Sequence, residues 1–387
     1  MMEYTTYKIS EIGNVITGKT PPTKIKEFFS ETPDKYLFIT PRDMNIESKY
    51  IYCTERYLTD YVTDKFKNII IDEKSICVSC IGTVGKVFIP SQLSITNQQI
   101  NSITNIKSFC DYNYLYYYLK CNYKKIQAVA GGTTMPIVNK SSFEDIEVEL
   151  PDVIYQKKVS KILGTIDSKI KINNDLNANI YNMMINLFNN YIDNLETYDE
   201  STLSEIASYK NGLAMQKFRP INEEGLPVIK IKEMNSGISS DTERCRTDIP
   251  SDVTINDGDV LFAWSGTLCM NIWCGGKAGL NQHIFKVTSE KYPKWFYYFW
   301  TLKYLNSFIE IAAGKATTMG HIKREELDKA IVKIPSNESI KKMGNIFEPL
   351  FKEYINNNIE NRQLTELRDS LLPKLINGEI DLDNIEV

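Results

Sequence analysis

Apolar residues recur at alternating steps of four and three along two long stretches of the sequence, 159–191 and 343–375. This spacing is typical of a coiled-coil seam, so we expect two long helices that each pack against a partner. Each stretch follows a proline, Pro151 or Pro335. Segments before these prolines have a different, shorter period, so the helices are expected to begin where the period changes.

Both seams carry two asparagines at their centre. An antiparallel pairing of the two helices places Asn173 opposite Asn361 and Asn177 opposite Asn357. A parallel pairing would also match asparagines, but the connecting chain would have to return the full length of a helix. Polar residues in a seam lower stability and fix the register. We therefore expect these four asparagines to set the register of an antiparallel pair.

The same register has one unfavourable contact, because it turns Ile166 towards Arg368. The ends of the helices carry ordinary signals. Asp152 and Ser336 follow the prolines and are suited to cap the first turns, and Gly378 is suited to end the second helix.

The two helices belong to a duplication that covers the whole chain. One constant offset in residue number relates 133–135 to 317–319, 97–98 to 281–282, and 82–83 to 266–267. Nearer the start of each copy the offset grows, so that 43–45 matches 233–235 and 10–12 matches 204–206. Copies of this length indicate two homologous domains and not a solenoid.

Each copy has a mixed pattern ahead of its helix. The runs 74–89 and 259–273 are apolar and β-branched with glycines between them, as strands are. The tyrosine-rich segments 111–127 and 294–311 have polar residues at helical spacing, which predicts amphipathic helices packed on a sheet. The sequence thus predicts a mixed α/β (α+β) fold.

The expected organisation has four parts: a first domain at 1–150, a central helix at 151–195, a second domain at 196–334, and a C-terminal helix with a tail at 335–387. An antiparallel helix pair would relate the two domains by an approximate two-fold axis. A protein of this kind suits a target in two halves along a linear polymer, because half-site spacing on DNA follows domain spacing.

Composition is typical of a folded protein, with 42% hydrophobic and 11% aromatic residues. The N-terminal segment has no basic stretch followed by an apolar run, and no run of about 18 uncharged apolar residues occurs. Eight cysteines in this context indicate reduced thiols. We expect a cytoplasmic protein with no membrane association. A net charge of −4 argues against binding DNA through bulk charge alone.

Three segments are similar to a known family: "KISEIGNVITGKTP" at 8–21, "ELPDVIYQKKVSKILGTIDSKI" at 149–170 and "LRDSLLPKLINGEIDL" at 367–382. Together with the duplication, they make the chain resemble the specificity subunit of Type I restriction-modification systems. The resemblance implies that each domain is a target recognition domain that reads one half of a split sequence in double-stranded DNA. The helices would act as a spacer and would dock two methyltransferase subunits.

The resemblance also implies that restriction/translocase subunits join the complex, which methylates adenine at N6 or cleaves DNA. S-adenosylmethionine, ATP and magnesium would be carried by these partners, and no cofactor by this chain. Two alternatives stay open: the recognition subunit of a Type IIB-like enzyme with fused methyltransferase and nuclease, and a two-domain scaffold that binds protein.

Patterns that could support catalysis in the chain itself are weak. "CVSC" at 77–80 has metal-ligand spacing but lacks a second pair, and "GTVGK" at 82–86 lacks the spacing of a phosphate-binding loop. Asp34, Glu47 and Lys49 fit a nuclease pattern only nominally, since the second copy does not repeat it. We expect no catalytic residue and no metal site, and the chain is predicted to bind and not to catalyse.

Candidate DNA contacts follow from the chemistry of base edges and phosphates. Polar residues in turns that both copies share are candidates for docking: Thr83, Lys86, Asn97, Gln98, Gln99, Thr133 and Thr134, with Ser265, Thr267, Asn281, Gln282, His283, Thr317 and Thr318. Discrimination between bases should lie where the copies differ: Lys19, Lys24, Arg42 and Arg56, with Lys217, Arg219, Lys230, Lys232, Arg244 and Arg246. The alternative is structural, since Asn-Gln can cap a turn and Gly-Thr can close a hairpin.

Overall fold

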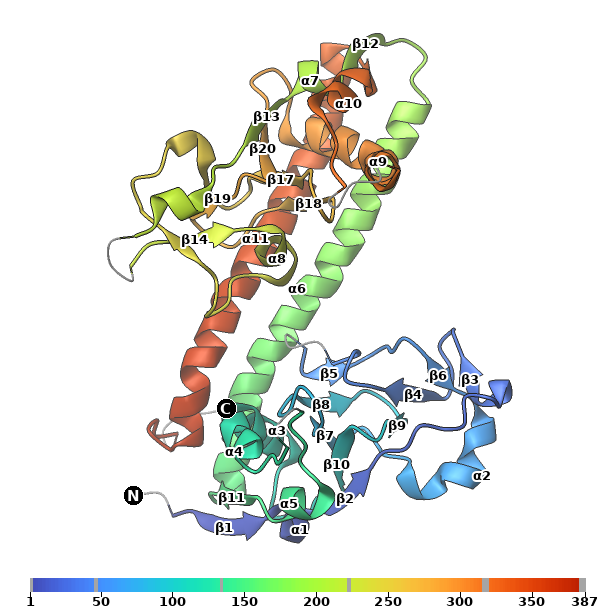
Figure 1. Cartoon of the computed structure of the whole chain (residues 1–387), viewed down its shortest axis with the longest axis vertical. Coiled ribbons are helices and arrows are strands. Elements are labelled where there is room, and N and C mark those ends of the chain that lie inside the picture. Colours follow the sequence, from blue (N-terminus) through green and yellow to red (C-terminus); the bar gives the residue numbers. More distant parts are fainter. Residues whose placement is uncertain (1–2, 45–47, 133–134, 221–223, 315–319, 383–387) are drawn as a thin grey trace. The chain divides into compact units, whose positions relative to one another are not determined.

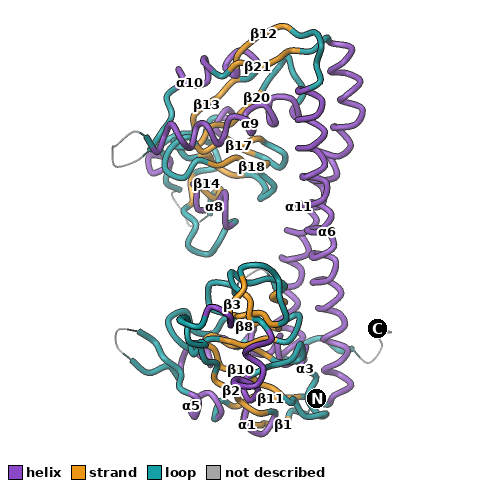
Figure 2. Tube along the Cα trace, turned by 90° about the vertical axis from the view of Figure 1, so that its right-hand side faces the viewer, coloured by secondary structure: helices purple, strands orange, loops and turns teal. Residues whose placement is uncertain are grey.

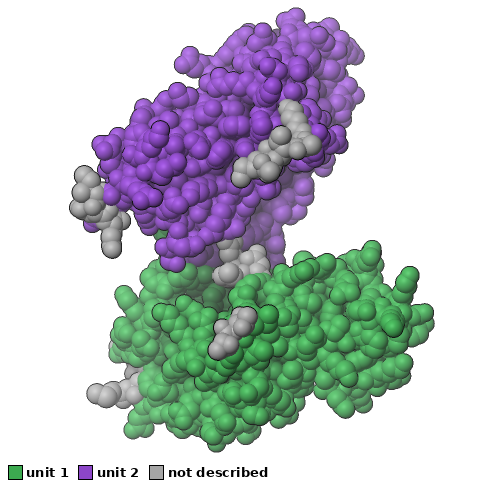
Figure 3. Space-filling view, in the orientation of Figure 1, with its two compact units in different colours: residues 1–168, 366–387 green, residues 169–365 purple. Residues whose placement is uncertain are grey.

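The structure is a computed structural model that describes residues 3–44, 48–132, 135–220, 224–314 and 320–382. The chain divides into two compact units, which Figure 3 colours separately. Unit 1 comprises residues 1–168 and 366–387, and unit 2 comprises residues 169–365. Each unit therefore holds one globular domain together with a segment of each long helix. We call the globular parts domain 1 (1–150) and domain 2 (196–334).

The elements of domain 1 are shown in Figure 1. The strands are β1 (Thr5–Lys8), β2 (Asn14–Thr17), β3 (Phe29–Ser30), β4 (Tyr36–Ile39), β5 (Tyr50–Ile51), β6 (Tyr57–Leu58), β7 (Ile76–Ser79), β8 (Val87–Pro90), β9 (Ser94–Thr96), β10 (Ile100–Thr104) and β11 (Glu147–Leu150). The helices are α1 (Ile9–Ile12), α2 (Thr63–Phe66), α3 (Tyr112–Cys121), α4 (Tyr123–Ala128) and α5 (Lys140–Glu144), with 3-10 turns at Lys26–Phe28, Asp60–Val62 and Lys67–Ile69.

Domain 2 repeats this series with changes in its loops. The strands are β12 (Asp199–Thr202), β13 (Ser208–Asn211), β14 (Leu226–Ile229), β15 (Arg244–Cys245), β16 (Thr254–Ile255), β17 (Val260–Ala263), β18 (Cys269–Ile272), β19 (Ala278–Leu280), β20 (Ile284–Thr288) and β21 (Ile331–Ile334). The helices are α7 (Leu203–Ile206), α8 (Ile231–Ser236), α9 (Lys294–Ala313) and α10 (Arg324–Lys329), with 3-10 turns at Met215–Phe218 and Ser251–Val253. The long helices are α6 (Val153–Asp193) and α11 (Asn337–Ile376).

Sheet topology shows the duplication directly. The order β2-β10-β7-β8 in domain 1 is repeated as β13-β20-β17-β18 in domain 2. A parallel pair, β4 with β9, is repeated as β14 with β19, and the first and last strands of each domain pair antiparallel. The mixed α/β architecture that the sequence predicts is confirmed.

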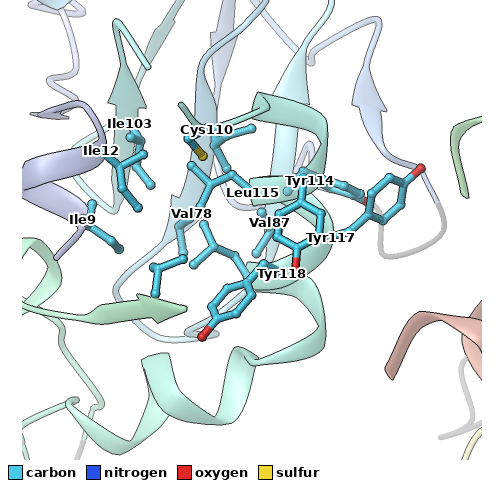
Figure 4. Close-up of a cluster of buried hydrophobic side chains, with 14 of the residues drawn as sticks. Ile9, Ile12, Val78, Val87, Ile103, Cys110, Tyr114, Leu115, Tyr117 and Tyr118 are labelled. Atoms are coloured by element: carbon cyan, nitrogen blue, oxygen red, sulfur yellow. The ribbon is translucent and has the colours of Figure 1, made fainter. Parts of the chain in front are cut away.

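The core of domain 1 lies between its larger sheet and helix α3. Figure 4 shows Tyr114, Leu115, Tyr117 and Tyr118 of α3 with Val78, Val87 and Ile103 from the strands. These tyrosines are almost completely buried. The aromatic run that the sequence presents is therefore the buried face of a helix on a sheet. In domain 2, α9 buries its aromatic residues in the same way.

Helices α6 and α11 lie side by side within each unit (Figure 2), and antiparallel partners meet along the predicted seam. In unit 2, Asn173 donates a hydrogen bond to Asn361 (3.0 Å), and Asn357 donates one to Asn177 (3.0 Å). Asn173, Asn177 and Asn357 are at most 5% exposed. Each buried amide thus has a partner in this register, whereas a shifted register would leave it unpaired.

The pattern of burial departs from the predicted seam at one end of α6. Beyond Met184 the most buried residues are Phe188 and Ile192, one position after the predicted Leu187 and Tyr191. The shift has a local cause, because Phe188 packs against aromatic side chains of α9. The helix buries the face that contacts domain 2 in preference to the strict seam.

Candidate nucleic-acid interface

Three turns of domain 1 meet at one place, because backbone hydrogen bonds join them. The Cys80 amide donates to the Gln99 carbonyl (2.7 Å), the Val138 amide donates to the Cys80 carbonyl (2.8 Å), and the Gly82 amide donates to the Pro136 carbonyl (3.1 Å). We call the segments 80–83, 97–99 and 136–138 the turn platform of domain 1.

Domain 2 builds the same platform from the equivalent residues, 264–267, 281–283 and 320–322. The Trp264 amide donates to the His283 carbonyl (3.3 Å), the Ile322 amide to the Trp264 carbonyl (3.2 Å), and the Gly266 amide to the Gly320 carbonyl (2.9 Å). All three hydrogen bonds recur at the constant offset that relates the two copies. Elements distant in sequence, which the duplication pattern singled out, are thus brought together in both domains.

Glycines are required at two positions of each platform. Gly82 and Gly266 have φ values of 76° and 73°, a backbone conformation that side chains with a Cβ rarely adopt. Gly18 and Gly212 pack directly beneath the Asn-Gln turn, where an added Cβ would lie 2.3 Å from the Asn97 carbonyl oxygen or 2.4 Å from that of Asn281. Gly18 and Gly212 were not among the residues predicted from the sequence, although they are equivalent in the two copies by the offset that relates 10–12 to 204–206.

The shared asparagines have a structural role in the platform. The Asn97 side chain accepts a hydrogen bond from the Gln99 amide (3.0 Å), and Asn281 accepts one from the His283 amide (3.3 Å). Both asparagines are 8% exposed. Each asparagine holds its turn by the local hydrogen bond that is typical of Asx turns. The next residue in each turn, Gln98 or Gln282, is exposed and faces outward.

The other shared candidates differ in exposure. Thr83 and Thr267 are exposed, whereas Ser265 is buried. The Lys86 ammonium donates to the Met44 carbonyl (3.0 Å), so this lysine also holds a loop of its own domain. Thr133, Thr134, Thr317 and Thr318 lie outside the described residues, as does Glu47.

The basic residues that differ between the copies fall into two groups. Lys19, Lys24, Arg42, Lys217 and Arg219 are exposed. Exposed lysines and arginines are the side chains that most often meet phosphates in complexes with DNA.

The remaining basic candidates make contacts within their own domains. Arg56 lies over the rings of Phe29 and Phe38, Arg244 donates to the Gly225 carbonyl, and Lys230, Lys232 and Arg246 form ion pairs with Glu243, Asp241 and Asp248. Surface ion pairs contribute little to stability and exchange readily for other partners. Contact with DNA by any of these residues stays a prediction.

The platform of domain 2 is richer in aromatic and imidazole groups than that of domain 1. Trp264 stacks on Phe285 with 5.6 Å between ring centroids, and the rings of His283 and His321 lie 6.1 and 6.3 Å from the Trp264 ring. Gln282 is within hydrogen-bond distance of His283 (3.2 Å). Both histidines of the sequence therefore gather at this one place.

Side chains suited to metal binding do not assemble in the described parts of the chain. No group of three or more His, Cys, Asp or Glu residues there is placed to hold a metal ion. Burial raises the pKa of the Cys77 thiol to about 12 and that of Cys80 to about 11, which disfavours the thiolate. Within the same residues, no helix combines the length and apolar character needed to cross a bilayer.

Domain 1 is fixed to the helices of unit 1 by a buried charged cluster. Arg368 of α11 donates to Asp167 of α6 (2.9 Å), and the Tyr117 hydroxyl of α3 donates to the other carboxylate oxygen of Asp167. Arg368 is 6% exposed. The unfavourable contact expected between Ile166 and Arg368 is therefore resolved by the next residue of α6, a carboxylate that sequence analysis passed over.

Two lysines lie close to this cluster. Burial lowers the pKa of Lys49 to about 8, against the opposing effect of Asp167. Burial, followed by the charge of Arg368, lowers the pKa of Lys120 to about 8. The Lys49 ammonium lies 4.5 Å from the centroid of the Tyr117 ring, a distance at which cation–π attraction offsets part of the cost of burial.

Domain 2 is fixed to α11 by a different contact. The Arg362 guanidinium donates to both carboxylate oxygens of Asp257 (2.8 and 3.0 Å) and to the Cys274 carbonyl (2.6 Å). Asp257 also accepts from the Gly276 amide (2.7 Å). A bidentate pair of this kind holds a loop in one orientation. The positions that correspond to Arg362 and Asp257 in the first copy are Ala178 and Glu73, so the duplication gave no signal for this pair.

Comparison with known proteins places this architecture in a family. The profile of the Type I restriction modification DNA specificity domain matches residues 1–182 and 195–367. The chain is similar to the Type I restriction enzyme MjaIX specificity subunit of Methanocaldococcus jannaschii, with 26% identity over 417 residues that cover 98% of this chain and 94% of that one.

It is also 37% identical to the Type I restriction enzyme HindI specificity subunit of Haemophilus influenzae over 163 residues, which is 40% of this chain and 34% of the relative. The fold is similar to the crystal structure of the S subunit of a Type I restriction-modification system from M. genitalium, with a TM-score of 0.61, 17% identity and coverage of 97% and 96%. The chain therefore belongs to the family of Type I restriction-modification DNA specificity subunits.

Proposed function

We propose that this chain reads a DNA target in two halves, one with each domain, and that it carries no catalytic group of its own. The observation that supports this proposal is the turn platform, which has the same backbone hydrogen bonds in both domains. The two platforms share the exposed pairs Gln98/Gln282 and Thr83/Thr267 and differ at other exposed or partly exposed positions, such as Gln99/His283 and Ile137/His321. Two readers with identical side chains would demand identical half-sites. A common backbone with different exposed groups instead suits two docking surfaces of one kind that recognise different bases.

The two long helices would hold the methyltransferase subunits. In unit 2, α6 exposes Ile172, Leu176 and Met183, which are 60%, 40% and 44% exposed. These residues are four and seven positions apart, so they form one stripe on the helix, separate from the buried seam. An exposed apolar stripe is a feature of a surface that a partner covers. The partners would supply S-adenosylmethionine for methylation, and ATP and magnesium for restriction.

The proposal is tested by expressing the chain together with the methyltransferase encoded nearest to it and mapping N6-methyladenine on the host DNA by single-molecule sequencing. A split motif with an unspecified spacer is the expected result. A stable purified complex that methylates no defined motif would contradict the proposal and favour a scaffold role. A partner that carries methyltransferase and nuclease in a single chain would instead identify a Type IIB-like system.

Docking has a separate test. The substitutions Ile172→Glu and Leu176→Glu place charges on the exposed stripe, and we expect them to reduce co-purification of the methyltransferase by about tenfold or more, because each charge would be buried without a partner. Ile309→Glu, at a residue of α9 that is 41% exposed and lies away from the stripe, is the matched control and should leave co-purification unchanged. Equal recovery of the partner with all three variants would contradict docking at this surface.

A further inference from the structure

The two turn platforms differ at one pair of equivalent positions that faces solvent. Ile137 of domain 1 pairs with Ile81 in an isolated β-bridge, and His321 of domain 2 pairs with Ser265 in the equivalent bridge. Ile137 is 44% exposed, and His321 is partly exposed. The backbone thus presents position 137 and position 321 in the same way, with an apolar side chain in one domain and an imidazole in the other.

The residues that pack beneath position 137 in domain 1 also differ from those beneath position 321 in domain 2. In domain 1, Cys80 lies at the base of the platform and accepts a hydrogen bond from the Asn101 amide group (3.4 Å). In domain 2, the equivalent residues are Trp264 and Phe285, whose stacked rings support the imidazoles. The two domains therefore differ in a connected set of side chains and not at a single position.

Polar atoms in the domain 2 platform also lack partners in the described parts of the chain. The Trp264 indole nitrogen and His283 Nδ1 are buried there without a hydrogen bond. Unpaired buried polar atoms are rare in folded proteins and call for an explanation. A hydrogen-bonding ligand at the platform, which reorients the adjacent imidazole, would satisfy them. Domain 1 has Cys80 and Gln99 at these positions, and the unpaired buried side-chain atoms among its described residues lie elsewhere, at Thr96 Oγ1 and the Tyr114 hydroxyl.

The chemistry of the two side chains selects different base edges. In the major groove, thymine presents its C5-methyl group to apolar side chains, and guanine presents N7 and O6 as acceptors. An exposed isoleucine offers only apolar contact. A histidine offers an N–H donor, which adenine N7 and thymine O4 can also accept, but guanine alone presents two acceptors, N7 and O6, on one base edge.

We propose that Ile137 and His321 are specificity-determining residues, Ile137 for an A·T pair in one half-site and His321 for a G·C pair in the other. This inference rests on the proposed function, since it names the side chains that make the two readers differ. Recognition at position 321 depends on Trp264 and Phe285, because the Trp264 ring contacts the imidazoles of His283 and His321 and stacks on Phe285. Recognition at position 137 requires only the exposed methyl groups.

The test exchanges the two side chains in the full chain, co-expressed with its methyltransferase. Ile137→His and His321→Ile are each mapped by single-molecule sequencing of N6-methyladenine. We expect each variant to change selection at one position of one half-site, by about tenfold or more, and to leave the other half-site unchanged as an internal control. Ile331→His is the matched control, because Ile331 is also 44% exposed but lies on β21.

Loss of folding is separated from loss of recognition by a conservative variant. His321→Gln keeps a polar side chain and should move the preference at that position from guanine towards adenine, which glutamine recognises through N6 and N7. The inference is overturned if the wild-type complex yields a bipartite motif and the position 137 and 321 variants all yield the same motif. If the wild-type complex yields no defined motif, the proposed function fails, and the inference fails with it.

Discussion

The buried pair between Arg368 and Asp167 provides a sharp test of how domain 1 is held on its helices. Replacing Arg368 with methionine, the residue at the equivalent position 184 in the first helix, removes the cation and keeps an unbranched apolar chain. The carboxylate of Asp167 then stays buried with the Tyr117 hydroxyl as its remaining partner in α3. Its side chain is only 13% exposed, so water replaces little of the lost interaction.

Removing one partner of a buried ion pair costs about 3 to 5 kcal/mol. We expect Arg368→Met to fall at the lower end, about 3 kcal/mol, because Tyr117 and the nearby Lys49 still stabilise the carboxylate. Burial alone would lower the pKa of Arg368, but its hydrogen bonds with Asp369 and Asp167 and the charges of these carboxylates together raise it. The guanidinium therefore stays charged at any accessible pH, and pH cannot relieve the loss.

Hydrogen exchange by mass spectrometry measures this cost locally and does not require the two units to unfold together. For Arg368→Met, exchange of the α3 peptide (112–121) should accelerate by about 100-fold, which corresponds to about 3 kcal/mol. The α9 peptide (294–313) of unit 2 should change little. Asp369→Asn is the control, since the Asp369 side chain is 56% exposed and its pair with Arg368 should contribute less than about 1 kcal/mol. Equal exchange in Arg368→Met and Asp369→Asn would refute the reasoning.

Other buried groups and one tight turn support three more predictions. The pKa of Lys49 falls from 10.5 in the unfolded chain to about 8 in the folded chain, so between these pH values the unfolded chain binds more protons. As pH rises from 8 to 10.5, the free energy of unfolding of wild type should therefore increase by about 3 kcal/mol relative to that of Lys49→Met. A difference between the two proteins that does not change with pH in urea unfolding would contradict this. Gly276→Ala should cost more than Gly82→Ala, since both glycines have positive φ but only the first added Cβ meets Arg362 (3.2 Å), whereas the second has no atom within 4 Å. Equal thermal shifts would show that the contact with Arg362 does not matter. Asn357→Leu should cost about 1 to 3 kcal/mol by leaving the buried Asn177 Oδ1 without its donor, and combining it with Asn177→Leu should recover this stability. A double variant as unstable as the single variant in thermal denaturation would argue against the pairing.

Long-range repetition made much of this fold predictable from one sequence. The constant offset between the copies and the four-three stripe identified the helices and the shared turns, and the antiparallel register follows from matching the asparagines. Tyr114 and Tyr117 were assigned to a packed helix because their segment has helical spacing. Signals of this kind are spread over many residues, so a local exception does not remove them.

The contacts that fix each domain on its helices could not be predicted in the same way. Asp167 stands beside the seam in sequence, and only the rotation of α6 shows that it reaches Arg368. Gly18 and Gly212 lie far in sequence from the turns they contact, and a single glycine is a weak signal. Position 137 was overlooked because an exposed isoleucine has no recognisable motif, and its equivalence with His321 has meaning only on a common backbone.

The two domains contact their helices through different sets of side chains, and the ion pairs that hold them do not occupy equivalent positions. Where domain 1 uses Tyr117, Asp167 and Arg368, the equivalent positions in unit 2 are Thr301, Phe351 and Met184. Phe351 and Met184 belong to an aromatic and apolar core, and Thr301 is buried with its hydroxyl 2.7 Å from that of Tyr209. A gene conversion that copied domain 2 over domain 1, without the helix segments, would leave Asp167 and Arg368 facing Thr301 in place of Tyr117, and would leave Asp257 facing Ala178 in place of Arg362. New half-site combinations should therefore arise by recombination that transfers a domain into the same position of a related gene, and exchange between the two halves of one gene should be counter-selected.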